Sequence, residues 1–309
     1  MKVAVWGAGH VGTGLVRRLA TTDFVSEVFW LNRNWERIAH ESIDIEHGLA
    51  FAPTCRNVEA HSQEAAAQVL PRADLLILTL GVGVKSGQTR AELYPAQREL
   101  FRTTVIPALA RFPGIVLVVT NPVDLMARLV HRETGLPSEQ VLGLGTTVET
   151  ARLRASLAGY LSPKPPAREV WAYAVGTHDE HFVPIVLPRP TPGAEVAPRE
   201  LQAIVRWASR EVTKGATRVK AGAAATLHPI VEAAVDLTRA IALDSHCIRT
   251  PSVLDPDSPA GLFYSVPCTL GRGGLVRRHT EILQSSEIAE GLKACRAALE
   301  GTLRVAGEL

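Results

Sequence analysis

The chain opens with Lys2–Gly12 (KVAVWGAGHVG), an apolar run followed by a glycine-rich turn. Beyond the turn, apolar residues recur at Val11, Leu15 and Leu19, which is the spacing of one helical face. A strand that leads through GxGxxG into a helix is the pattern of a Rossmann dinucleotide-binding unit. This stretch therefore predicts an α/β fold that begins with a cofactor site.

The turn supplies the backbone features that a dinucleotide needs. Gly7 permits the tight turn, Gly9 lets the pyrophosphate approach the backbone, and Gly12 lets helix and strand pack closely. The N-terminus of the helix then offers unpaired N–H groups to the phosphates. The predicted cofactor residues in this turn are Gly7, Gly9, His10, Val11 and Gly12.

Three further apolar runs follow in the first half, at Val25–Leu31, Leu75–Leu80 and Ile115–Val119. The last two are of the kind found in strands that a parallel sheet buries on both faces. Strand and helix patterns alternate, so we expect a doubly wound parallel sheet, a Rossmann domain over residues 1–143.

The second half has a different pattern, and two proline-rich stretches, 163–166 and 188–198, read as surface loops. We expect a separate α+β substrate domain over residues 144–309. Its expected elements are a strand in Val170–Val175, a helix over Leu201–Val212, a buried alanine-rich helix over Gly222–Ala242, antiparallel strands in Ser252–Leu270 and a terminal helix over Ile288–Leu303.

Composition excludes several classes of protein. The formal net charge of the 309 residues is only +2, and basic residues are scattered, so we expect no nucleic-acid partner. The chain has no apolar run long enough to span a membrane and begins directly with a strand, so we expect no membrane partner and a cytoplasmic location. Four cysteines without CxxC pairs, and without a nearby histidine at the spacing of metal ligands, read as buried thiols, with no metal site.

The end of the second predicted strand bears on the choice of cofactor. An acidic residue is usual there, because its carboxylate holds the adenine ribose hydroxyls. Here Asn32 and Arg33 follow Leu31. Asn32 does not repel a 2′-phosphate, and Arg33 either binds one or points into solvent. The predicted cofactor is therefore NAD or NADP, and the pair favours NADP.

Five motifs occur in a fixed order along the chain, and their order is more specific than any one of them. With these motifs the sequence resembles the lactate/malate dehydrogenase family nearly from end to end. The motifs are Gly7–Gly12 (GAGHVG), Gly81–Arg90 (GVGVKSGQTR), Thr120–Asp124 (TNPVD), Gly143–Arg154 (GLGTTVETARLR) and Gly176–Pro184 (GTHDEHFVP).

The resemblance implies a role for each of five residues in an NAD(P)-dependent 2-hydroxy acid dehydrogenase. Asn121 lies by the nicotinamide and hydrogen-bonds the reacting oxygen, and Gly81 belongs to the cofactor site. Arg152 holds the substrate carboxylate with two parallel hydrogen bonds, for which its planar fork is suited. Arg90 polarises the carbonyl. His178 donates and accepts the proton.

A carboxylate behind the catalytic histidine fixes its tautomer and orientation. The family has an aspartate at this position, and this chain has Glu149, which is one methylene longer. The family also reads GxHGD at the histidine, whereas Asp179 replaces that glycine here, which predicts an altered backbone. His181 is a rival to His178, although its distance from Gly176 fits the motif less well.

The resemblance also implies a substrate pocket closed by a loop that ends at Arg90. The residue that reads the substrate side chain is glutamine in lactate enzymes and arginine in malate enzymes, and here it is Val84. Ala221 leaves space in the pocket, and Thr217 matches a pocket threonine. An apolar 2-oxo monocarboxylate therefore fits better than oxaloacetate, unless Lys85 supplies a charge from a differently folded loop.

Other functions stay open at this point. A malate or lactate dehydrogenase proper is one alternative. NAD-dependent glycosidases share the architecture but need Cys and His ligands for a metal, and a TNPVD segment stands where a Cys-containing one is expected. A dinucleotide-binding sensor is suggested by Glu149 and Asp179, whereas the intact Arg90, Asn121 and His178 favour an enzyme. The resemblance implies a homodimer or homotetramer.

Overall fold

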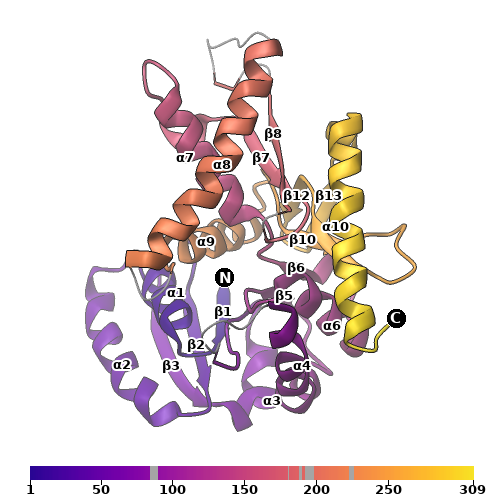
Figure 1. Ribbon diagram of the computed structural model, residues 1–309. Helices are drawn as coiled ribbons and strands as arrows, with labels where there is room; N and C mark the ends of the chain where they lie inside the picture. Colours follow the sequence, from indigo (N-terminus) through magenta and orange to yellow (C-terminus); the bar gives the residue numbers. More distant parts are fainter. Residues whose placement is uncertain (84–89, 180, 188–189, 192–197, 223–225) are drawn as a thin grey trace.

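The computed structural model describes residues 1–83, 90–179, 181–187, 190–191, 198–222 and 226–309, with the backbone alone for 90–91, 198–199, 201 and 215–222. Its largest sheet has eight strands and lies at the centre of the first half (Figure 1). In spatial order the strands are β11 (Phe263–Ser265), β10 (Ser252–Leu254), β6 (Val141–Gly143), β5 (Ile115–Val118), β4 (Leu75–Leu78), β1 (Lys2–Trp6), β2 (Glu27–Asn32) and β3 (Asn57–Ser62).

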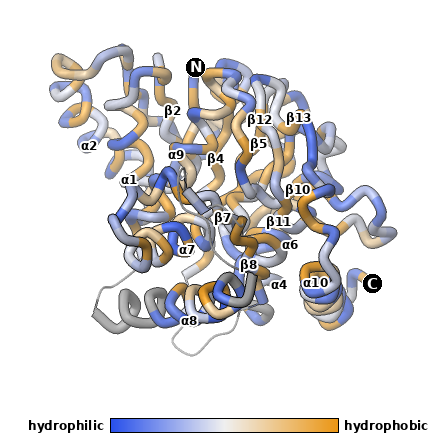
Figure 2. The backbone as a smooth tube through the Cα atoms, turned by 90° about the horizontal axis from the view of Figure 1, so that it is seen from above, coloured by the Kyte–Doolittle hydropathy of each residue, from blue (hydrophilic) through white to orange (hydrophobic). Residues whose placement is uncertain are grey.

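The six strands from the first half are parallel, and helices cover both faces of this sheet. The central strands β4 (LLIL) and β5 (IVLV) are buried at every position, which explains their continuous apolar sequences and their orange colour in Figure 2. The helices of this half are α1 (His10–Ala20), α2 (Trp35–Gly48), α3 (Ala66–Val69), α4 (Arg90–Leu100), α5 (Ile106–Ala108) and α6 (Val123–Thr134). The doubly wound parallel sheet is thus confirmed.

The second half contributes a smaller layer of helices and antiparallel strands, drawn in the upper and right-hand parts of Figure 1. Here α7 and α8 pack against each other and enclose a second apolar core with the β7–β8 pair. The elements are α7 (Thr147–Tyr160), β7 (Ala172–Val175), β8 (Val183–Val186), α8 (Pro198–Gly222), α9 (His228–Ala242), β9 (Ile248–Arg249), β12 (Cys268–Gly271), β13 (Gly274–Arg278) and α10 (Ser286–Val305). The α+β character predicted for this half is confirmed.

Two elements illustrate where the structure differs from the sequence prediction. Strand β3 was not expected, because its sequence NVEAHS is polar and only Val58 is buried, as suits the edge of a sheet. The alanine-rich helix was expected from Gly222, but α9 begins at His228 and Gly222 ends α8. Pro229 in the first turn explains this start, since proline is favoured there and disfavoured inside a helix. None of the helices in the described ranges is both long and apolar enough to cross a bilayer.

A buried carboxylate near the C-terminus ties three segments together. The Oε1 of Glu308 accepts hydrogen bonds from Tyr94 (2.9 Å) and Arg98 (3.0 Å) of α4, and its Oε2 accepts one from Arg128 of α6 (2.5 Å). The side chain of Arg128 is 2% exposed and also donates to the carbonyl of Ala260 at 2.8 Å. Because α4 begins at Arg90, this cluster fixes the helix that follows the predicted substrate loop.

Replacing Glu308 with alanine should lower the free energy of unfolding by about 3 kcal/mol, because it leaves the buried Arg128 without its carboxylate. Urea denaturation of the variant measures this. Glu300→Ala is the control, since Glu300 pairs with a largely exposed Arg304, and it should cost less than about 1 kcal/mol. Equal stabilities of the two variants would contradict the role of Glu308.

The same pair of proteins gives a pH test. Burial alone raises the pKa of Glu308, but its bonds to Arg98, Tyr94 and Arg128 lower it below the usual value. The contribution is therefore complete above the ordinary glutamate pKa of about 4.3 and is lost as the pH falls through the lower value of the folded state. The difference in stability between native protein and Glu308→Ala should shrink in that acidic range.

Candidate active site

The glycine-rich turn lies at the carboxyl edge of the parallel sheet. Gly7 has a φ of 125°, and a Cβ there would lie 2.5 Å from Thr79 Oγ1 and 2.7 Å from the backbone nitrogen of Leu80. A Cβ on Gly12 would collide with the carbonyl oxygen of Gly7. These two positions therefore require glycine for packing, as the motif predicts.

Gly9 has a different environment, because a Cβ at this position would meet nothing within 4 Å. Gly9 is also the N-cap of α1 and offers no side chain to the first N–H groups of the helix, at His10 and Val11. Open space beside exposed helical N–H groups is what a pyrophosphate needs. The turn thus fits a dinucleotide.

Asn32 ends β2, and its side chain is already partly engaged. Its Nδ2 donates to the carbonyl of Asn34 at 3.0 Å, which leaves Oδ1 as the side-chain atom that can accept a further hydrogen bond. Asn34 in turn accepts from the N–H of Arg37 and caps α2. Arg33, between them, is exposed.

Gln97 of α4 is a buried residue that the motifs did not indicate. Its Oε1 accepts from the N–H of Val82 at 3.0 Å, and its Nε2 donates to the carbonyl of Asn121 at 3.2 Å. A Cβ on Gly81 would lie 2.6 Å from the same Nε2. Gln97 therefore links the segment after β4 to the segment after β5, so that Gly81 and Asn121 lie at one edge of the sheet.

His178, Glu149 and Arg152 are brought together from two segments of the second half. His178 Nδ1 lies 2.8 Å from Glu149 Oε2, and Arg152 Nη1 donates to Glu149 Oε1 at 3.1 Å. Glu149 and Arg152 lie one turn apart on α7, and Glu149 is 5% exposed. The additional methylene of glutamate does not prevent contact with the histidine. His178 and Glu149 are therefore within hydrogen-bond distance, and their catalytic roles stay predictions.

The electrostatics of this group keep the carboxylate charged. Burial on its own raises the pKa of Glu149, but the charge of His178, its hydrogen bond and the guanidinium of Arg152 bring that pKa below its usual value. A charged carboxylate on Nδ1 holds the imidazole in one orientation and directs Nε2 away from α7. The arrangement suits a histidine that gives and takes a proton at Nε2.

The backbone before His178 is fixed by the edge of the large sheet. Gly176, with a φ of 90°, exchanges two backbone hydrogen bonds of 2.8 Å with Ser265 of β11. Asp179 has no positive φ, so the aspartate in place of the family's glycine does not impose a left-handed backbone. Whether the aspartate alters the backbone relative to the rest of the family stays a prediction.

The rival histidine has different partners. The side chain of His181 is 50% exposed, and its Nδ1 lies 3.2 Å from Asp179 Oδ1 rather than at Glu149. Asp179 also accepts from the N–H of His181 and from the hydroxyl of Thr177, both at 2.8 Å. The geometry thus favours His178 as the acid–base residue.

Several predicted residues lie outside the described part of the structure. Val84 and Lys85 fall in the undescribed range 84–89. Arg90 is the first residue of α4, and Thr217 and Ala221 lie in α8, but only their backbones are described. Their roles as substrate residues stay predictions.

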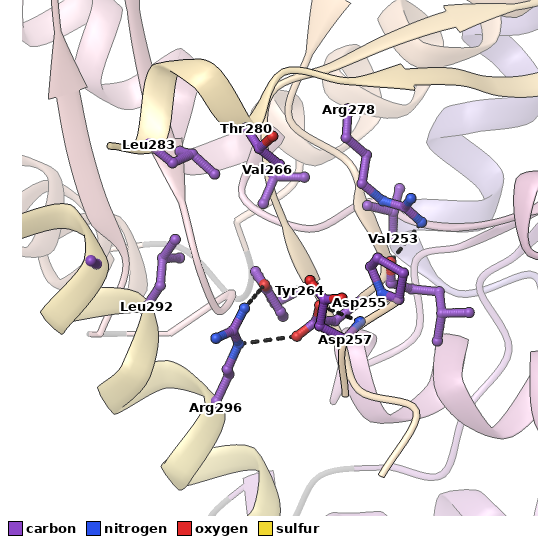
Figure 3. A pocket seen from close by; sticks show the side chains of 13 residues that line it. Val253, Asp255, Asp257, Tyr264, Val266, Arg278, Thr280, Leu283, Leu292 and Arg296 are labelled. Carbon is purple, nitrogen blue, oxygen red and sulfur yellow. Dashed lines mark hydrogen bonds and ion pairs between the residues drawn. The ribbon is translucent and has the colours of Figure 1, made fainter. Parts of the chain in front are cut away.

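A separate pocket of about 250 Å³ lies between β10, β11, β13 and α10 (Figure 3). Two of its charged groups are paired: Arg296 donates to the hydroxyl of Tyr264 at 2.6 Å and pairs with Asp255 at 3.0 Å. Arg278 donates to the carbonyl of Leu254 at 2.7 Å. None of the predicted site residues lines this pocket.

In the part of the chain that the structure describes, no three His, Cys, Asp or Glu side chains are grouped as ligands for an ion. The four cysteines are all described, and they form no disulfide.

Comparison with known proteins gives a consistent result. Residues 1–143 match the family model described as the NAD binding domain of lactate/malate dehydrogenase. The chain is 30% identical over 319 aligned positions to an L-lactate dehydrogenase of Geobacillus kaustophilus, with 98% of this chain and 96% of that protein covered. An L-lactate dehydrogenase of Bacillus caldotenax shows the same identity and coverage.

Solved structures agree with this assignment. The minor L-lactate dehydrogenase of Enterococcus mundtii matches with a TM-score of 0.84 and 25% identity, over 98% of both chains. A lactate dehydrogenase from a deep-sea metagenome library matches with a TM-score of 0.83 and 26% identity, again over 98% of both chains. The chain therefore belongs to the lactate/malate dehydrogenase family of NAD-dependent 2-hydroxy acid dehydrogenases.

Proposed function

We propose that this protein reduces a 2-oxo monocarboxylate with an apolar side chain to the 2-hydroxy acid, and catalyses the reverse oxidation. The observation that carries the proposal is the contact of His178 Nδ1 with Glu149 and of Glu149 with Arg152. This group supplies a proton donor and a carboxylate anchor on adjacent elements, which are the two functions that reduction of a 2-oxo acid demands.

Three residues of this chain bind the substrate, supply the proton and stabilise charge during the reduction. The reduced nicotinamide supplies the hydride. Arg152, whose fork is oriented by Glu149, holds the substrate carboxylate in a bidentate pair. Negative charge develops on the carbonyl oxygen, and the imidazolium of His178 stabilises that charge and transfers its Nε2 proton to the oxygen. Glu149 stays charged and stabilises the imidazolium before transfer.

The preference for an apolar side chain follows from the residues expected in the pocket. Val84 offers no charge to a second carboxylate, and an unpaired buried charge costs several kcal/mol. Contact with Val84 contributes only about 1–3 kcal/mol. Exclusion of a dicarboxylate should therefore be sharper than discrimination among apolar acids, and lactate dehydrogenase activity is one form of this proposal.

A panel of 2-oxo acids with different side chains tests the substrate, with NADH and NADPH oxidation as the readout. An apolar acid should exceed oxaloacetate in kcat/KM, and Val84→Arg should raise oxaloacetate reduction and depress the apolar acids. If oxaloacetate wins by tenfold, about 1.4 kcal/mol, another group such as Lys85 binds the second carboxylate. If no acid is reduced, the protein is a dinucleotide-binding sensor instead.

We also propose that NADPH is used at least as well as NADH. The neutral Asn32 and the exposed Arg33 support this, because neither repels a 2′-phosphate. Asn32→Asp should shift preference toward NADH, since a carboxylate repels the phosphate and accepts from both ribose hydroxyls. The ratio of kcat/KM for the two cofactors measures it. A strong native preference for NADH that Arg33→Ala leaves unchanged would refute it.

The proposed setting is the cytoplasm, which the free thiols of all four cysteines support. The proposed assembly is a homodimer or homotetramer, as the family resemblance implies. The proposed partners are small 2-oxo and 2-hydroxy acids.

A further inference from the structure

Asp124 is a buried acidic residue for which the mechanism above has no role. It lies in the first turn of α6, three residues after Asn121, and is 6% exposed. Its Oδ2 accepts a hydrogen bond of 3.2 Å from the backbone N–H of His178, which is 54 residues away in sequence. One carboxylate thus joins the segment that carries Asn121 to the peptide that carries the proposed acid–base residue.

The surroundings of Asp124 come from four elements. His178 and Asp179 face it from the loop after β7, Ser252 from β10 and Cys295 from α10. Behind His178 stand Glu149 and Arg152 of α7. Among the described residues, the N–H and the positive charge of His178 and the nearby hydroxyl of Ser252 favour a negative charge on Asp124, although Ser252 Oγ and Asp124 Oδ1 form no hydrogen bond of ordinary geometry.

Burial raises the pKa of Asp124 to about 6, although the Ser252 hydroxyl and the N–H and charge of His178 oppose that rise. The neighbouring charge of Asp179 adds to it. Asp124 therefore changes charge at a pH where an aspartate at an exposed helix terminus would be fully ionised. A carboxylate that only interacted with the positive end of the α6 dipole would need no burial and no contact with His178.

We propose that Asp124 is a positioning residue for His178, active in its ionised form. The ionised carboxylate holds the His178 peptide so that Nδ1 meets Glu149 and Nε2 faces the substrate, and it attracts the imidazolium that gives up its proton during reduction. This rests on the proposed role of His178. Protonation of Asp124 weakens both effects, so the rate of 2-oxo acid reduction falls on the acidic side.

The central test is Asp124→Asn, which keeps the shape and an acceptor oxygen but removes the charge. Loss of a charge-assisted hydrogen bond predicts a fall in kcat of about 10- to 100-fold, with KM for the 2-oxo acid changed by less than about threefold. The acidic limb of the kcat–pH profile should disappear in this variant. A purely structural role would lower kcat without altering the profile.

Two companion variants sharpen the test. Ser252→Ala removes the hydroxyl that favours the ionised carboxylate, so it should move the acidic limb to higher pH. Asp257→Asn is the matched control, because Asp257 is exposed, and it should leave both kcat and the pH profile as in the native protein. A native kcat and a native profile in Asp124→Asn would overturn the proposal.

A readout that needs no turnover separates this inference from the proposed function. In protein labelled with ¹⁵N-histidine, the backbone amide resonance of His178 should follow a titration near pH 6 in the native protein and lose it in Asp124→Asn. If the native protein reduces no 2-oxo acid but this titration is present, the proposed function fails while the link from Asp124 to His178 stands. Absence of the titration in the native protein overturns the inference.

Discussion

Replacing His178 with asparagine should lower kcat for 2-oxo acid reduction by about 10²- to 10⁴-fold, the usual contribution of general acid–base catalysis. Asparagine is similar in size but has no proton to give at the position of Nε2. Binding of NADH should persist, because the glycine-rich turn is untouched. Steady-state kinetics measure the loss, and NADH fluorescence on titration measures cofactor affinity.

His181→Asn is the matched control for this experiment. The side chain of His181 is half exposed and is paired with Asp179, so its loss should leave kcat within about threefold of native. Near-native turnover in His178→Asn together with a collapse in His181→Asn would transfer the acid–base role to His181.

Replacing Arg152 with lysine should lower kcat/KM by about 100-fold, because one charge remains but the bidentate pair with the substrate carboxylate is lost. Both a higher KM and a lower kcat are expected, since the anchor also orients the reacting carbonyl. The bond of Arg152 to Glu149 adds to the effect, as it sets the direction of the fork. Kinetics with the best acid of the panel measure both constants.

Arg168→Lys is the control for the general effect of this substitution, because the Arg168 side chain is 85% exposed. It should behave as native protein. An unchanged KM in Arg152→Lys would show that another residue holds the substrate carboxylate.

Sequence patterns predicted those helices and strands that form because of residues within their own short segment. The buried strand β1 and the helix α1 follow from an apolar run, a glycine-rich turn and a helical stripe. Strand β3 could not be found this way, because its polar sequence becomes a strand only by pairing with β2 along all six residues. The start of α9 was misplaced because alanine continues the helical pattern on both sides of the break.

The site likewise has residues that a sequence motif indicates and residues whose roles depend on distant contacts. His178, Glu149 and Arg152 were predictable because the order of the motifs carries them. Asp124 stood inside a quoted motif, but its role depends on a contact with the His178 backbone across 54 positions. Gln97 lies in no motif and works through the backbone of Val82 and Asn121. A contact with a backbone atom does not depend on the residue type there, so the amino-acid sequence contains no pattern that indicates it.

Strands β10 and β11 come from the second half of the chain, yet they continue the sheet of the first half beyond β6. Ser252 pairs with Gly143, and Ser265 at the far edge pairs with Gly176, two residues before His178. One hydrogen-bonded layer therefore runs from the glycine-rich turn to the catalytic loop. A hinge between the halves would have to break these hydrogen bonds, so the distance between the glycine-rich turn and His178 is set by the backbone of this layer. Adaptation to substrates of different size must then come from side chains and loops outside the layer.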